Sequence, residues 1–115
     1  MQILWRLEFE SFDPDGKYLH EAAQSYQRIV TDLENPDQIK IVTAATSRNR
    51  LILAGPGSGK TKTVVHRCAY LLRVESIRPQ SSLVCCFSRN AAVELRRRLA
   101  DLVGHDEVQK LWGSL

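Results

Sequence analysis

Near its middle the chain reads Leu51-Ile52-Leu53-Ala54-Gly55-Pro56-Gly57-Ser58-Gly59-Lys60-Thr61. The apolar run 51–54 stops at glycines, which predicts a short buried strand, and a long helix is expected to begin at Gly59 or Lys60. Glycines allow the close backbone path in which N–H groups point inward around an anion. The following helix adds its free N–H groups and the positive end of its dipole. This order of elements predicts a P-loop that holds phosphates.

The side chains after the loop fit the same chemistry. We expect Lys60 to reach the β and γ phosphates as a point charge and the Thr61 hydroxyl to bind Mg²⁺, so these two residues are the candidate catalytic pair. The expected ligand is ATP held through Mg²⁺. A bare turn without a ligand would not need both residues, and Ala54 stands where the strict motif has Gly. The candidate phosphate site comprises Gly55, Pro56, Gly57, Ser58, Gly59, Lys60 and Thr61.

The segment after the first long helix repeats the pattern of a strand followed by a helix. Residues 82–87 include Leu-Val-Cys-Cys-Phe, which is apolar on both faces, as in a strand of a parallel sheet. Residues 90–102 have helical spacing, and Gly104 closes that helix. The order strand, helix, strand, helix predicts an α/β fold with a partial parallel sheet flanked by helices.

The first third of the chain carries no recognisable chemistry. Residues 3–12 alternate polar and apolar side chains, which predicts a strand, and residues 18–33 have helical spacing. A second helix is expected from Asn35, a good N-cap followed by Pro36, to about Ala45. We therefore divide the chain into an N-terminal extension, residues 1–34, and a partial P-loop domain, residues 35–115.

Composition and charge narrow the class of protein. The chain has 115 residues, 43% hydrophobic and 25% charged, as in one ordinary globular domain. No apolar run approaches the roughly 20 residues that span a bilayer, and residues 1–10 lack the pattern of a signal peptide, so we expect a cytoplasmic protein. The net charge of +3 permits a polyanionic partner without requiring one. The cysteines lack metal-ligand spacing and lie in apolar stretches, so we expect buried reduced thiols at Cys68, Cys85 and Cys86.

Upstream of the P-loop, the segment Asn35-Pro36-Asp37-Gln38-Ile39-Lys40-Ile41-Val42 resembles the Q motif of superfamily 1A helicases of the UvrD/Rep type. A primary amide can donate to and accept from one adenine edge at the same time. The resemblance therefore implies that Gln38 selects adenine. On chemistry alone an alternative is equally open, in which the Gln38 side chain reaches back to its N-cap, Asn35.

A second segment is similar to motif Ia of the same family, which lies on single-stranded DNA. It reads Phe87-Ser88-Arg89-Asn90-Ala91-Ala92-Val93-Glu94-Leu95-Arg96-Arg97-Arg98-Leu99, with Ser88 in place of the usual Thr. A base can stack on Phe87, and Ser88, Arg89 and the next helix N-terminus can hold phosphates. The alternative is that Phe87 belongs to the core and the three arginines form a solvated face. The resemblance implies DNA contacts at Phe87, Ser88, Arg89 and Asn90.

The resemblance covers about residues 35–100 and implies a RecA-like motor fold, ATP binding and movement on single-stranded DNA. The family usually has Arg after the P-loop Thr, where it packs against the base, and this chain has Lys62, which lacks a planar guanidinium. We still count Lys62 among the nucleotide-binding candidates. The usual Asn-Lys before Ala-Ala is Arg89-Asn90 here.

An NTPase also needs an apolar strand that ends in Asp-Glu, to complete the Mg²⁺ shell and position water. Asp106-Glu107 has no strand before it, and we interpret it as the acidic first turn of a short helix. The family's arginine finger and second motor domain are not found. We therefore expect the N-terminal part of a helicase motor whose remainder is missing, with negligible hydrolysis of its own. The alternative is a stand-alone P-loop module that binds nucleotide without turnover, and a small-molecule kinase would need an acid and a basic lid that we do not find.

Overall fold

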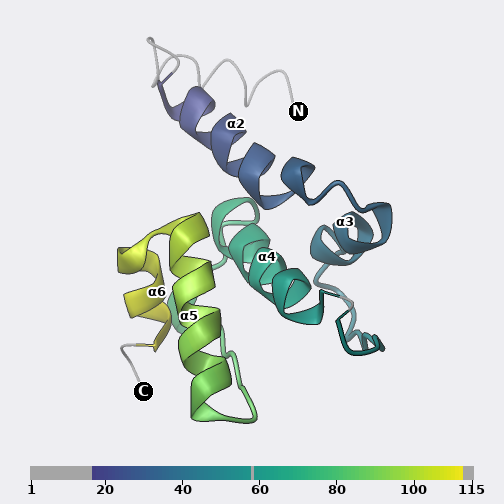
Figure 1. Ribbon diagram of the computed structural model, residues 1–115. Helices are drawn as coiled ribbons and strands as arrows, with labels where there is room; N and C mark the ends of the chain where they lie inside the picture. Colours follow the sequence, from purple (N-terminus) through teal and green to yellow (C-terminus); the bar gives the residue numbers. More distant parts are fainter. Residues whose placement is uncertain (1–16, 58, 113–115) are drawn as a thin grey trace.

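The computed structural model describes residues 17–57 and 59–112, and within these ranges every regular element is a helix (Figure 1). The elements are α2 (Lys17–Ile29), η1 (Thr31–Leu33), α3 (Pro36–Val42), α4 (Lys60–Arg73), η2 (Pro79–Ser81), α5 (Arg89–Val103) and α6 (His105–Trp112). None of the described helices is long and apolar enough to cross a membrane.

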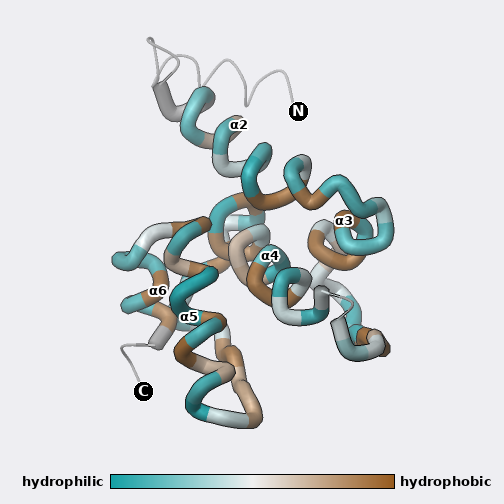
Figure 2. The backbone as a smooth tube through the Cα atoms, viewed as in Figure 1, coloured by the Kyte–Doolittle hydropathy of each residue, from teal (hydrophilic) through white to brown (hydrophobic). Residues whose placement is uncertain are grey.

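Helix α4 lies at the centre of the molecule (Figure 1). It packs against α2, α3 and α5, and α6 packs against α5. Hydrophobic stretches gather where α4 meets its neighbours, as Figure 2 shows. The buried apolar side chains come from every helix but the short η2 and form one cluster: Ile29, Val30, Leu33, Val42, Val65, Ala69, Tyr70, Leu72, Leu95, Leu99, Ala100, Val103, Val108 and Leu111.

The helix ends follow from local hydrogen bonding. Asn35 caps α3, because its side chain accepts from the backbone N–H groups of Asp37 and Gln38. Ser88 caps α5 by accepting from the N–H of Ala91 at 3.2 Å. Gly104 ends α5 with a φ of 93°, in the region that favours glycine. The predictions of the Asn35 cap, the helix end at Gly104 and a short final helix with an acidic first turn are confirmed.

The N-terminal helix is fastened to α4 by a buried histidine. The ring of His66, in α4, lies with Nδ1 2.7 Å from the carbonyl oxygen of Ile29, at the end of α2. An N–H on that nitrogen donates to the carbonyl and satisfies it inside the core. The expected helix 18–33 is therefore correct up to Ile29, after which Val30 leads into the 3₁₀ turn η1.

The predicted parallel sheet is wrong. Residues 51–54 and 82–87 form no strand, and Leu51 and Leu53 are 85% and 86% exposed. In the second segment, Val84 and Cys86 pack against the helical core while Leu83 is exposed. An apolar run needs burial, but a strand forms only by pairing its backbone with a neighbouring chain, and the run does not specify that partner. The strand expected at residues 3–12 lies outside the described part of the chain.

The cysteine prediction is wrong at one position of the three. Cys85 is exposed, whereas Cys68 and Cys86 are half-buried against the core. Burial raises the pKa of the Cys68 thiol to about 11, from an ordinary value of 9.0. The expected apolar strand put Cys85 and Cys86 on two buried faces. In the structure only one face of this extended segment packs against the core. Successive side chains of an extended segment point to opposite sides, so Cys86 is packed and its neighbour Cys85 is exposed.

Candidate functional site

The glycine-rich loop leads directly into α4. Gly57 and Gly59 both have left-handed backbone conformations, with φ of 76° and 82°. Gly59 is the N-cap residue, and the helix starts at Lys60, where the sequence predicts it. Left-handed geometry costs a residue with a side chain about 1–2 kcal/mol, so glycine is favoured at both positions. Ser58, a predicted phosphate ligand, lies outside the described residues.

Gln38 projects from α3 onto this loop. A Cβ built on Gly59 would lie 2.8 Å from the Nε2 atom of Gln38, too close for real contact. The loop therefore accommodates Gln38 because residue 59 has no side chain. Among the described residues no hydrogen bond joins the Gln38 side chain back to Asn35, so the capping-box alternative is not what the structure adopts.

Charge at the start of α4 favours an anion. Lys60, Thr61 and Lys62 are exposed in the first turn, which contains no acidic residue. Two cations at the positive end of a helix dipole are unfavourable unless an anion lies beside them. The first N–H groups of a helix also have no partner within it. One turn further, Thr63 turns inward and donates its hydroxyl to the Gly59 carbonyl at 3.0 Å, which stiffens the base of the loop.

The segment that resembles motif Ia surrounds the start of α5. Phe87 is fully exposed, so the alternative that it belongs to the core is wrong. Arg89 and Asn90 are exposed in the first turn of the helix. The Ser88 hydroxyl oxygen accepts the cap bond from the N–H of Ala91, and its O–H is left to donate to an acceptor such as a phosphate oxygen. These residues belong to α5 and not to α4, the helix that follows the glycine-rich loop, although the two helices pack together.

Two of the arginines that follow are held by one carboxylate. Glu94 accepts hydrogen bonds from Arg97 at 2.8 Å and from Arg98 at 2.7 Å. These bonds lower the pKa of Glu94 to about 2. Arg97 and Arg98 are therefore held in ion pairs on α5, Arg97 lying also 3.8 Å from Asp101. Arg89, beside Phe87, forms no ion pair with any of the described residues.

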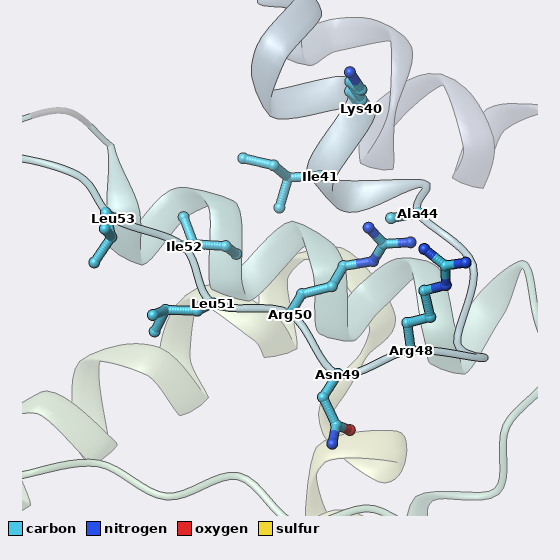
Figure 3. A pocket seen from close by; sticks show the side chains of 9 residues that line it. All are labelled: Lys40, Ile41, Ala44, Arg48, Asn49, Arg50, Leu51, Ile52 and Leu53. Atoms are coloured by element: carbon cyan, nitrogen blue, oxygen red, sulfur yellow. The ribbon is translucent and has the colours of Figure 1, made fainter.

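A basic cleft next to the loop was not predicted from the sequence. It has a volume of about 530 Å³ and lies between α3 and residues 48–53 (Figure 3). Among the described residues its charged lining consists of Lys40, Arg48 and Arg50, and no carboxylate of that part of the chain lines it. In the sequence, Arg48-Asn49-Arg50 is typical of a polar loop. The sequence alone does not show that Lys40, eight residues earlier, lies close to these two arginines in the fold.

The profile of the UvrD/REP helicase N-terminal domain matches residues 34–114. The chain belongs to this family. The match begins at the residue before the Asn35 cap and includes α3, the glycine-rich loop and α5. The resemblance seen in the two sequence motifs is thereby confirmed.

Individual relatives of the UvrD/REP family agree over a shorter stretch. The chain is 46% identical over 68 residues to DNA helicase II of Salmonella typhimurium and 44% identical over 68 residues to that of Escherichia coli. It is 45% identical over 64 residues to the ATP-dependent DNA helicase PcrA of Staphylococcus epidermidis. These matches cover 59%, 59% and 56% of this chain but only 9% of each relative.

Proposed function

We propose that this chain is the ATP-binding N-terminal part of an ATP-dependent DNA helicase or translocase. In this proposal the loop 55–59 and the first turn of α4 hold the phosphates, Lys60 contacts the β and γ phosphates, and the Thr61 hydroxyl binds Mg²⁺. The relatives are DNA helicases, and PcrA is an ATP-dependent one, which supports this class of reaction. Bound Mg²⁺ would neutralise part of the phosphate charge.

The observation that carries the proposal is the contact of Gln38 with Gly59 at the start of α4. An amide that can read one adenine edge lies directly beside the turn that would hold the phosphates. The two lysines of the first turn supply positive charge, and Thr61 is exposed, so its hydroxyl is accessible to an ion. The residues at this site therefore fit a nucleotide with its metal.

We further propose that single-stranded DNA lies on the N-terminus of α5. The exposed ring of Phe87 offers a stacking surface, and Arg89 offers a cation for a phosphate. Asn90 adds an amide in the same turn. Ser88 can add a donor, because its hydroxyl oxygen accepts from the N–H of Ala91 while its O–H can donate to a phosphate oxygen.

Calorimetric titration with Mg·ATP tests the nucleotide site. Lys60→Ala should weaken binding at least tenfold, because it removes the main side-chain charge from the phosphates. Lys110→Ala is the matched control, since it removes one exposed lysine from α6. Gln38→Ala should reduce the preference for ATP over GTP and leave most of the phosphate affinity. Equal ATP affinity in wild type and Lys60→Ala would refute the proposed phosphate site.

The alternative function is a stand-alone module that binds nucleotide without turnover. Phosphate release by the chain that exceeds a no-protein control and is lost in Lys60→Ala would exclude this alternative. Binding of a single-stranded oligonucleotide through Phe87 would also exclude it. ATP binding without either result would favour the module over the motor.

A further inference from the structure

The basic cleft beside α3 is built from positively charged groups that lack a counter-charge. Lys40, Arg48 and Arg50 are all exposed, and among the described residues none of them forms an ion pair. In Figure 3 the guanidinium groups of Arg48 and Arg50 point the same way, toward the end of α3 at Ala44. The Arg50 guanidinium also reaches the carbonyl oxygen of Ala45, at 3.5 Å. Like charges directed at one place repel one another unless an anion occupies it.

The negative end of the α3 dipole does not cancel this charge. Arg67, from α4, donates to the carbonyl oxygen of Val42 at 2.8 Å and also to that of Ala44. These two carbonyls at and just after the end of α3 are therefore already paired with a cation. Arg67 adds a further positive charge next to the cleft, so the electrostatic potential there is positive despite the helix C-terminus.

We propose that this cleft binds the phosphate backbone of a nucleic-acid strand, as a contact separate from the segment 87–90. Lys40 lies within α3, whereas the guanidinium groups of Arg48 and Arg50 point toward Ala44, two residues beyond the end of that helix, so the cations are spread along the cleft and not gathered at one point. A strand carries a phosphate at about every 3.4 Å of duplex axis, which suits spread charges better than one compact phosphate group does. The identity of the partner rests on the proposed function, while the cleft itself does not.

The cleft also has apolar side chains on both of its sides. Ile41 and Ile52 line it, and Figure 3 shows both side chains between α3 and the loop. A polar anion alone would leave these side chains in water. The sugars and base faces of a strand can cover them while its phosphates meet the arginines, so the lining fits a ligand with alternating charged and apolar parts. Leu53, the last residue of the lining on the side formed by residues 48–53, leads into the glycine-rich loop.

Fluorescence anisotropy with a labelled oligothymidylate, titrated at several salt concentrations, tests the cleft. In Arg48→Gln/Arg50→Gln the affinity at low salt should fall at least tenfold, and the slope of log affinity against log salt should flatten by about 1.4, or 0.7 for each of two phosphate contacts. Arg78→Gln/Lys110→Gln removes the same charge from exposed positions outside the cleft. It should change the slope by less than half as much. Melting temperatures should be unchanged, because all four side chains are exposed.

Three results would overturn the inference. The first is an unchanged salt slope in the cleft variant, and the second is an equal loss in the control variant, which would mean that net charge alone acts. The third is a loss of Mg·ATP affinity in the cleft variant, which would assign the cleft to the nucleotide. Failure of the proposed function gives a different pattern, in which Lys60→Ala or Phe87→Ala has no effect while the cleft variant still weakens oligonucleotide binding.

Discussion

The Nε2 atom of Gln38 lies 2.8 Å from the position that a Cβ on Gly59 would occupy. Gly59 also has a left-handed φ of 82° and is the N-cap of α4. The absence of a side chain at residue 59 therefore leaves the space in which the end of the Gln38 side chain lies against the loop. Two requirements, one of backbone conformation and one of space, coincide at a single glycine.

Gly59→Ala should destabilise the fold by about 1–2 kcal/mol, because alanine must adopt a left-handed conformation. The contact with Gln38 adds less, since the end of a flexible side chain can move aside. In the double variant Gln38→Ala/Gly59→Ala, most of the loss should therefore persist. Urea unfolding of the two single variants and the double variant measures this. Full recovery in the double variant would show that space, and not backbone strain, is what Gly59 supplies.

Phe87→Ala should leave the melting temperature within a degree or two of wild type, because the ring is fully exposed. Binding of a single-stranded oligonucleotide should weaken by about 1–3 kcal/mol if a base stacks there. Thermal melts and anisotropy at low salt measure the two effects. Arg89→Gln is the companion variant and should flatten the salt dependence. A collapse of stability, or unchanged affinity, would argue against a stacking surface at Phe87.

His66→Ala should destabilise the protein by about 1–3 kcal/mol. It leaves the buried carbonyl of Ile29 without a partner and opens a gap between α2 and α4. His66→Gln should recover part of the loss if its amide reaches the carbonyl. Chemical denaturation followed by circular dichroism gives the free energies of unfolding. A loss below about 0.5 kcal/mol would show that water replaces the ring at no cost.

Thiol labelling should separate the cysteines. At pH 8, iodoacetamide should modify exposed Cys85 first, while Cys68, whose pKa is raised to about 11, should stay largely unmodified in the folded protein. The rate at Cys68 should rise roughly tenfold per pH unit toward pH 11, as its thiolate fraction grows. Because the folded pKa is the higher one, this thiol's contribution to stability is complete below about pH 9 and falls as pH rises toward 11. Peptide mapping by mass spectrometry measures the order, and equal labelling of Cys85 and Cys68 would contradict it.

The helices and several of their ends could be predicted from the sequence, since each depends on residues within a few positions of one another. The cap at Asn35, the end of α5 at Gly104 and the start of α4 at Lys60 need only a side chain or a backbone group one turn away. Family membership was likewise readable from two short motifs, and the profile match over residues 34–114 agrees with it.

The sheet could not be predicted in this way, and its prediction was wrong. The apolar runs at 51–54 and 82–87 indicate that burial of these residues is favourable. They do not specify which other segment would pair with their backbones to form a sheet. The same reasoning misplaced Cys85, which the structure leaves exposed.

Two features of the candidate site exist only because separate segments pack together. The approach of Gln38 to Gly59 requires α3 to lie on α4, and the cleft needs Lys40 on α3 together with Arg48 and Arg50 on the following loop. Local sequence determines where a helix begins, because the hydrogen bonds that cap a helix join residues only a few positions apart. The distance between helices depends on how their buried side chains fit, which is a property of the assembled core and is not encoded in any one segment.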